Sequence, residues 1–220
     1  MKIKKLLLSK LVVVLLIAAI SSLFFYSRMA EGADLEDSIS RIQKAYEGLT
    51  DIRGQFVQKS TIKDLGRTDT YKGEFFIKPP MKMKWSYKGN AAQDIIVNNE
   101  TMLMYKKGEK QAYRTRFDRE TYGQIPLALL GGFGKITEEF MITSKGNALI
   151  LKPKKTLGTV TSILITLSEV GFPVKSFTIY DSRANVVEVK LRDIATNTGI
   201  KDSLFDLTVP KGVSIFDQGF

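Results

Sequence analysis

The chain has 220 residues, and its 33 lysine and arginine residues exceed its 23 aspartate and glutamate residues, for a formal net charge of +10. It contains no cysteine and no histidine. Disulfides, thiolate or imidazole catalysis, a Ser-His-Asp triad and the common zinc sites are therefore excluded. We expect no cofactor and no metal.

Catalysis by carboxylates alone is the remaining chemical alternative. Asp34, Glu36 and Asp37 lie beside a helical stretch, where acidic residues favour the helix dipole. Glu138 and Glu139 are typical of a solvated face. The sequence shows no pair of convergent acids at a separation suited to hydrolysis, so we expect no enzyme.

Residues 1–33 are typical of an export signal. Four lysines precede a continuous apolar core over Leu11–Ile20, and small residues follow up to Ala33. The whole apolar stretch, Leu11–Tyr26, has 16 residues, which is short for a membrane-spanning helix. We expect a cleaved signal peptide, with an uncleaved anchor as the alternative, followed by a single domain over residues 34–220.

The charge of that domain indicates which partners suit it. Five basic residues and one acidic residue lie in residues 1–33, so 28 basic and 22 acidic residues remain, a net charge of +6. The lysines are spread along strands and turns, not clustered with aromatic residues, so we expect no nucleic-acid binding. The charge favours anionic lipid surfaces or an acidic partner, or else serves solubility alone.

Hydrophobic periodicity predicts one helix and many strands. Apolar spacings of three and four predict an amphipathic helix over Leu35–Leu49. The period then falls to two, and turn residues such as those at 98–99 and 171–173 separate short segments. The predicted strands are Arg53–Ser60, Thr70–Ile77, Met81–Lys88, Asp94–Val97, Met102–Tyr105, Gln111–Arg114, Phe140–Thr143, Leu149–Lys152, Thr159–Leu167, Val174–Asp181, Val186–Arg192 and Phe205–Thr208. Roughly eleven or twelve short strands in serial order predict a mainly β fold, an incomplete antiparallel β-barrel covered by short helices.

The segment 81–88 alternates strictly between large apolar and basic or polar side chains, and it includes the only tryptophan. Successive side chains of a strand point to opposite faces. One face therefore carries Met81, Met83, Trp85 and Tyr87, and the other carries Lys82, Lys84, Ser86 and Lys88. The apolar face is of the kind that lines a cavity for a hydrophobic ligand.

The segment Ile125–Gly134 interrupts the strand pattern. It is apolar, has Pro126 at a plausible first helical turn, and ends in glycines that suit a helix C-terminus. These features predict a short apolar helix, which is either an ordinary core plug or a lid over a ligand cavity.

Five features in this order resemble the LolA family, the periplasmic carriers of outer-membrane lipoproteins. The features are Phe56-Val57-Gln58; Gly73-Glu74-Phe75 leading to Pro80; Met83-Lys84-Trp85-Ser86-Tyr87; Pro126-Leu127 to Leu130-Gly131; and Phe205 through Pro210-Lys211-Gly212-Val213. Together they span nearly all of the chain after the expected signal.

The resemblance implies a β-barrel whose apolar interior takes the acyl chains of a lipoprotein and carries it through the periplasm from the inner to the outer membrane. The residues expected to line this cavity are Phe56, Phe75, Ile77, Met83, Trp85, Tyr87, Leu127, Leu130 and Phe133. For each of them plain core packing is the alternative. A module of the same fold that senses lipids or lipoproteins and signals, without delivering them, is the alternative function.

The resemblance also implies partners. An inner-membrane lipoprotein-releasing ABC transporter would load the protein, an outer-membrane receptor is left open, and we expect a monomer. Lys82, Lys84 and Lys88 are available for acidic surfaces. Where the family usually carries a latch arginine, this chain has Pro79, and Lys78 stands one position away without the bidentate fork of arginine.

Overall fold

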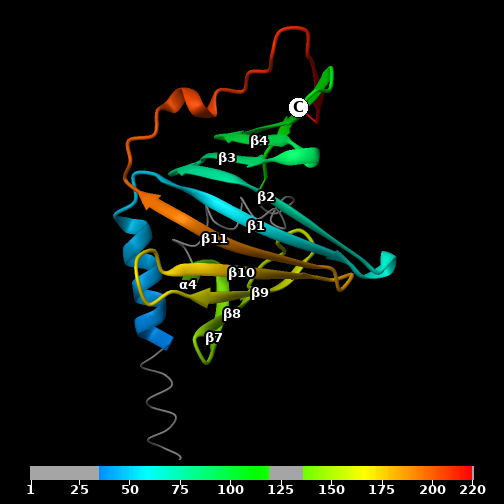
Figure 1. The fold of residues 1–220 in the computed structure, drawn as a ribbon. Coiled ribbons are helices and arrows are strands. Elements are labelled where there is room, and N and C mark those ends of the chain that lie inside the picture. The colour runs from blue at the N-terminus through cyan, green and yellow to red at the C-terminus, as the bar shows by residue number, and fades with distance from the viewer. Residues whose placement is uncertain (1–34, 119–135, 220) are drawn as a thin grey trace, which may run out of the picture. The chain divides into compact units, whose positions relative to one another are not determined.

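The structure of the protein is a computed structural model that describes residues 35–118 and 136–219 (Figure 1). The chain separates into two compact units, residues 1–38 and 39–220, and the second is described below. The expected signal and the segment Ile125–Gly134 lie outside the described residues. Within the described ranges, no helix has the length and apolar character needed to cross a membrane.

Twelve strands of the described residues form one sheet. Their bounds are β1 Ile52–Ile62, β2 Arg67–Lys78, β3 Lys82–Tyr87, β4 Gln93–Asn98, β5 Thr101–Lys106, β6 Gln111–Arg116, β7 Phe140–Lys145, β8 Ala148–Pro153, β9 Val160–Leu167, β10 Val174–Asp181, β11 Val186–Thr196 and β12 Ser214–Gln218. The order across the sheet is β12-β6-β5-β4-β3-β2-β1-β11-β10-β9-β8-β7.

The topology is a meander with one return. Strand β1 lies in the interior of the sheet and pairs antiparallel with β2 on one side and with β11 on the other (Figure 1). Strand β12 comes back to pair parallel with β6. Because β12 and β7 are the two ends of the order and do not pair with each other, the sheet stays open. The predicted incomplete barrel is confirmed, with twelve strands and one parallel pair.

The last predicted strand is wrong. Phe205–Thr208 pairs with no strand in the described chain, and a 3-10 helix, η4, occupies Asp202–Phe205 instead. The alternating pattern there arises because Phe205 is buried as a single anchor while its neighbour Asp206 is exposed. The true final strand, β12, begins nine residues after the end of η4 and has a buried pattern too weak to predict.

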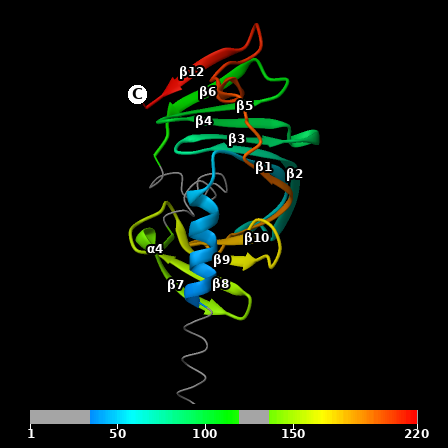
Figure 2. The same ribbon diagram turned by 90° about the vertical axis from the view of Figure 1, so that its left-hand side faces the viewer.

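The predicted amphipathic helix is confirmed over residues 35–47. The Arg41 guanidinium donates to the Ser168 carbonyl oxygen at 2.6 Å, and the Tyr46 and Phe172 rings lie 5.6 Å apart. These contacts hold residues 39–47 against the β9–β10 turn, as Figure 2 shows. A single helical turn, α4, follows at Ile136–Glu139, and short 3-10 helices η1 and η2 occupy Lys63–Leu65 and Gly89–Ala91.

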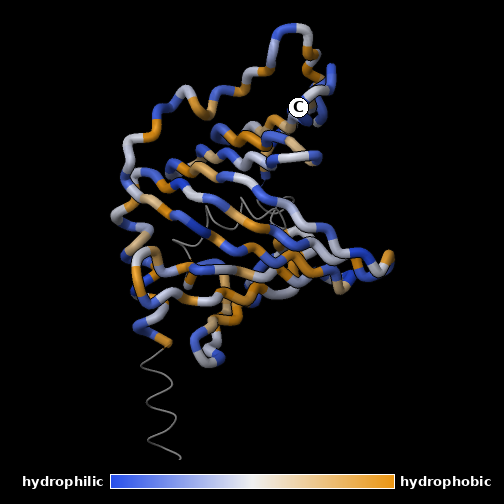
Figure 3. Tube along the Cα trace, viewed as in Figure 1, coloured by the Kyte–Doolittle hydropathy of each residue, from blue (hydrophilic) through white to orange (hydrophobic). Residues whose placement is uncertain are grey.

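Cross-strand register divides the sheet into two faces. Partners in the ladder point the same way, so Phe56, Gly73 and Tyr87 share a face, as do Phe75 and Trp85. We call this the inward face. Its buried apolar side chains include Ile52, Phe56, Phe75, Ile77, Met83, Trp85, Ile95, Val97, Met102, Leu149, Leu151, Ile163, Ile165, Phe177, Ile179, Val189 and Leu191. The alternation that creates it is visible along the strands in Figure 3.

Two glycines on the inward face make room for aromatic rings. A Cβ atom at Gly54 would lie 2.8 Å from the Phe75 ring, and one at Gly73 would lie 2.5 Å from the Phe56 ring and would collide with the Ser86 carbonyl oxygen. Each glycine stands opposite the ring that covers it, because Gly54 pairs with Phe75 and Gly73 with Phe56. The rings thereby fill the space that the missing side chains leave.

Residues 197–213 form a segment that we call the C-terminal strap, which runs from β11 past β3 and β4 to β12 (Figure 1). Its start is fixed by the buried carboxylate of Asp51, which accepts hydrogen bonds from the backbone N–H groups of Thr198, Gly199 and Ile200 and from the Thr198 hydroxyl. Further on, Phe205 is fully buried. The strap is therefore attached by the hydrogen bonds to Asp51 and by the buried side chain of Phe205.

Candidate functional site

An aromatic cluster occupies the centre of the inward face. The Phe56 and Trp85 rings stack with 3.9 Å between centroids and 19° between planes. Phe75, on the neighbouring strand β2, lies 5.8 Å from Trp85, and Tyr87 meets Phe56 edge to face at 5.4 Å. The 5.4 Å and 5.8 Å separations are within the usual range of favourable aromatic pairs, and the Phe56–Trp85 stack is closer than that range.

The structure brings the predicted cavity residues of the strands together. Phe56, Phe75, Ile77, Met83 and Trp85 all point inward and are at most 3 % exposed. Tyr87 lies on the same face and is half-buried, at the outer end of the cluster. The three helix residues predicted to close the cavity, Leu127, Leu130 and Phe133, lie outside the described residues.

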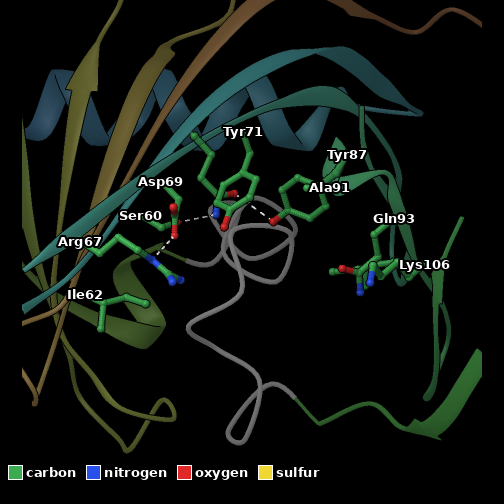
Figure 4. A pocket seen from close by; sticks show the side chains of 11 residues that line it. Ser60, Ile62, Arg67, Asp69, Tyr71, Tyr87, Ala91, Gln93 and Lys106 are labelled. Atoms are coloured by element: carbon green, nitrogen blue, oxygen red, sulfur yellow. Dashed lines mark hydrogen bonds and ion pairs between the residues drawn. The ribbon is translucent and has the colours of Figure 1, made fainter. Parts of the chain in front are cut away.

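A pocket of about 390 Å³ opens where the aromatic cluster ends. This volume is within the range of small-molecule sites. Figure 4 shows the Tyr71 and Tyr87 rings side by side in it, with Arg67 and Asp69 to one side and Lys106 to the other. Its lining residues are Gln58, Ser60, Ile62, Arg67, Asp69, Tyr71, Tyr87, Ala91, Gln93, Ile95 and Lys106.

The strand residues of this lining belong to the inward face. Gln58 pairs with Tyr71 in the ladder, Ser60 pairs with Asp69, and Tyr87 pairs with Gln93. The inward face therefore changes character along β1, from the apolar Phe56 to the polar side chains that follow it. The pocket is amphipathic, with aromatic rings at its inner end and polar groups at its mouth.

Hydrogen bonds connect the polar side chains of the pocket. Tyr87 donates through its hydroxyl to Gln58 Oε1 at 3.0 Å, and Gln58 Nε2 donates to Ser60 Oγ at 3.0 Å. Burial raises the pKa of the Tyr87 hydroxyl, and its interactions with Gln58 and Trp85 offset part of this rise. Tyr87 therefore remains a neutral hydroxyl at ordinary pH.

The sequence pattern alone gives no functional role to these polar residues. Gln58 appears in the Phe56-Val57-Gln58 motif, but the strand prediction ended at Ser60, before the inward positions at the hairpin tip. The strand alternation could have placed these polar residues on the inward face. Ser60 lies an even number of residues from Phe56, and Asp69 lies an even number of residues from Phe75.

The three lysines expected to meet acidic partners lie on the outward face or just beyond it. Lys82 forms an ion pair with Asp202 of the strap at 2.6 Å, and Lys88 forms one with Glu74 at 2.5 Å. Lys84 has no ion pair among the described residues and lines an outward pocket of about 420 Å³. Of the three, Lys84 is the one whose charge is not already matched within the described chain.

Lys78, one position from where the resemblance implies a latch arginine, contacts the C-terminal strap. Its ammonium donates to the Ile200 carbonyl oxygen at 3.2 Å and pairs with the Asp202 carboxylate. The two lysines around Asp202 hold the pKa of that carboxyl down to about 2. The described part of the chain has no cluster of three or more acidic side chains that could hold a metal ion.

Comparisons with known proteins show which sequences and folds this chain resembles. The sequence profile of the family described as outer membrane lipoprotein carrier protein LolA matches residues 47–208. An outer-membrane lipoprotein carrier protein from Alkalilimnicola ehrlichii is 26 % identical over 213 residues, which cover 96 % of this chain and 96 % of that protein. One from Yersinia enterocolitica is 26 % identical over 185 residues, with 84 % and 90 % covered.

Among solved structures, an uncharacterized conserved protein from Thermus thermophilus superposes with a TM-score of 0.53 at 9 % identity, covering 83 % of this chain and 98 % of that one. This likeness concerns the fold alone. The match of the family profile extends from the end of the first helix into the C-terminal strap and includes every residue of the aromatic cluster and of the pocket. The chain therefore belongs to the LolA family of outer membrane lipoprotein carrier proteins.

Proposed function

We propose that this protein is a periplasmic carrier that holds the acyl chains of outer-membrane lipoproteins against the inward face of its sheet and delivers them from the inner to the outer membrane. The observation that carries the proposal is the position of the pocket. In a chain of this family, an amphipathic pocket of about 390 Å³ opens directly beside the apolar cluster of Phe56, Trp85 and Tyr87.

The composition of the inward face supports this role energetically. Burying acyl chains stabilises a complex by roughly 0.8 kcal/mol per methylene group. A carrier must also release its cargo, so a deformable wall is better suited than a rigid one. Met83 and Met102 on the inward face supply flexible, polarisable side chains.

Loading is proposed to occur at an inner-membrane lipoprotein-releasing ABC transporter, with Lys84 among the contacts, and unloading at the outer membrane. The N-terminal segment 1–33 is proposed to direct export. No enzymatic step is part of this function, since holding and releasing acyl chains needs no bond to change.

A transfer assay tests the proposal. Purified protein is incubated with a triacylated lipopeptide, separated from free lipopeptide, and then mixed with acceptor vesicles. We expect a stable complex, a change in Trp85 fluorescence on loading, and passage of the lipopeptide to the vesicles. A lipopeptide that binds tightly but leaves Trp85 emission and its quencher access unchanged would place the cargo elsewhere. Binding without any release to acceptor vesicles would favour a sensing module.

A further inference from the structure

Gln58 is a polar side chain in an unusual position. It is 6 % exposed and lies on the inward face, between the aromatic cluster and the mouth of the pocket. Burying an amide is costly unless its hydrogen-bonding groups are satisfied. Its oxygen accepts from the Tyr87 hydroxyl and its nitrogen donates to Ser60, which makes a chain of three side chains from two strands.

Within the described residues, this run of three hydrogen-bonded side chains leaves donors available at the boundary of the apolar region. Gln58 has two N–H groups and uses one on Ser60, and the Ser60 hydroxyl accepts that bond and keeps its own hydrogen. Next to Tyr87, the fully buried indole N–H of Trp85 has no partner of good hydrogen-bond geometry among the described residues. The Tyr87 hydroxyl lies close enough to interact with it, and this interaction offsets part of the rise that burial causes in the pKa of Tyr87.

The charges at the mouth are already balanced. Arg67 pairs with Asp69 at 2.8 Å, and Lys106 pairs with Glu109 at 2.6 Å. No lining cation of the described pocket is left over for a phosphate group. The mouth therefore suits a ligand head that is uncharged and rich in acceptors.

We propose that Gln58, Ser60 and Tyr87 form a polar subsite that binds the ester-linked glyceryl head of a diacylated ligand, with donors directed at its ester carbonyl oxygens while the acyl chains pass toward Phe56 and Trp85. The subsite deepens the carrier function and rests on it. It makes the protein selective for how the acyl chains are attached, in addition to their hydrophobicity. The glutamine of the Phe56-Val57-Gln58 motif then has a recognition role.

The same ester chemistry occurs in the diacylglyceryl group of lipoproteins and in phospholipids. The paired charges at the mouth favour the diacylglyceryl group, because a phospholipid would bring a phosphate next to Asp69 without a free cation to meet it. At this partly exposed mouth the phosphate would be repelled by the Asp69 carboxylate.

Matched ligands test the subsite. Binding of a dipalmitoyl diester lipopeptide is compared with that of its dialkyl ether counterpart, which keeps the chains and the peptide but lacks the ester carbonyls. We expect the wild-type protein to bind the diester about tenfold more tightly, the effect of one or two hydrogen bonds. In Gln58→Met and in Tyr87→Phe this ratio should fall to about one while ether affinity is retained.

Gln55→Met is the matched control, since Gln55 lies three residues earlier on the same strand, exposed on the outward face. It should keep the wild-type ratio. Should Gln58→Met not fold, Tyr87→Phe and Ser60→Ala carry the same comparison with smaller changes. Circular dichroism and thermal unfolding of each variant establish that it is folded.

The outcomes separate the two levels of the proposal. A wild-type ratio near one, or a ratio unchanged in both variants, overturns the subsite and leaves the carrier function standing. Failure of the wild-type protein to bind either lipopeptide overturns both. Dipalmitoyl phosphatidylglycerol is the third ligand, and we expect it to bind more weakly than the diester lipopeptide. Equal or tighter binding that depends on Gln58 would overturn selection of the uncharged head.

Discussion

Phe56 and Trp85 stack face to face although they belong to β1 and β3, which are separated by β2. The contact exists because Gly73 of β2 lies directly opposite Phe56 and has no side chain to stand between the rings. The ring pair therefore links β1 to β3 across Gly73 of β2. The arrangement makes the backbone of β2 part of the floor beneath the proposed cargo site.

Gly73→Ala should damage this contact. The new methyl group would meet the Phe56 ring at 2.5 Å and collide with the Ser86 carbonyl oxygen, so ring and strand must shift. Overpacking of this kind costs about 1–3 kcal/mol of unfolding free energy, measurable by urea denaturation followed through Trp85 fluorescence. Gly48→Ala is the control, because a methyl group there meets nothing nearer than 3.9 Å. Equal stability of the two variants would contradict the proposed role of Gly73.

The sequence predicts well which strand residues face inward, and it predicts the C-terminal strap poorly. Both results have physical reasons. The alternation around Trp85 is local, and period two determines which side chains share a face. The strap is different, since it is held by Asp51 and by Asp202, whose partners are more than one hundred residues away along the chain. Such long-range hydrogen bonds and ion pairs leave no periodic signal. The strand predicted at Phe205 is wrong because alternation reports burial and does not require a ladder partner.

The polar part of the site shows the same limit. Gln58 and Ser60 read as ordinary strand residues, and the pocket becomes visible only when the register places them opposite Tyr71 and Asp69. The resemblance to the LolA family pointed to the apolar wall. The three-dimensional pairing of β1 with β2 was needed to show where that wall ends.

Met83→Glu should weaken cargo binding. Met83 is 2 % exposed beside the aromatic cluster, and an unpaired carboxylate there costs several kcal/mol unless it takes up a proton or admits water. Lipopeptide loading, measured by native mass spectrometry, should drop strongly. Met141→Glu is the matched control, since Met141 is 56 % exposed on the edge strand β7. Undiminished loading by Met83→Glu would argue against an acyl site at this position.

Asp51→Asn should make the protein less stable and less sensitive to acid. Burial alone would raise the pKa of Asp51, but hydrogen bonds from Thr198, Ile200 and Gly199 outweigh it and lower the pKa. A carboxyl group with a lowered folded-state pKa stabilises the fold above its unfolded pKa, about 3.9, and loses that contribution as pH falls through the folded value.

The loss of charge-assisted hydrogen bonds in this variant should cost about 2 kcal/mol at pH 7. The difference between wild type and variant should then shrink as the pH falls below about 4. Urea unfolding at a series of pH values measures both effects. A difference that stays constant from pH 7 to pH 2 would mean that the Asp51 carboxylate is not the source of the stability.

Lys84→Glu should slow association with the proposed loading transporter. Lys82 and Lys88 pair with Asp202 and Glu74, so their reversal would also disturb internal contacts, whereas reversal of Lys84 breaks no ion pair of the described chain. Exposed charges are screened beyond about 8 Å at physiological salt. Wild-type association should therefore slow as salt rises, and the variant should respond less.

Stopped-flow measurement of transfer from the transporter, at increasing sodium chloride concentration, gives the rates. Lys175→Glu, an exposed reversal on β10, serves as the control. If both reversals behave alike, or if wild-type transfer is independent of salt, the outward lysines contribute only to solubility.

The position of β1 also constrains the order in which the chain can fold. On one side β1 meets β2, which follows within a few residues, and on the other it meets β11, where Phe56 faces Leu191. Because the chain is synthesised from its N-terminus, the hairpins from β1 to β6 can form early, since their contacts are local in sequence. The edge of β1 that pairs with β11 stays unpaired until almost the whole chain has been synthesised. During that interval an unpaired strand with a buried-type sequence is exposed, which is the condition under which strands aggregate. The central strand β1 therefore needs protection from aggregation until β11 is available to pair with it.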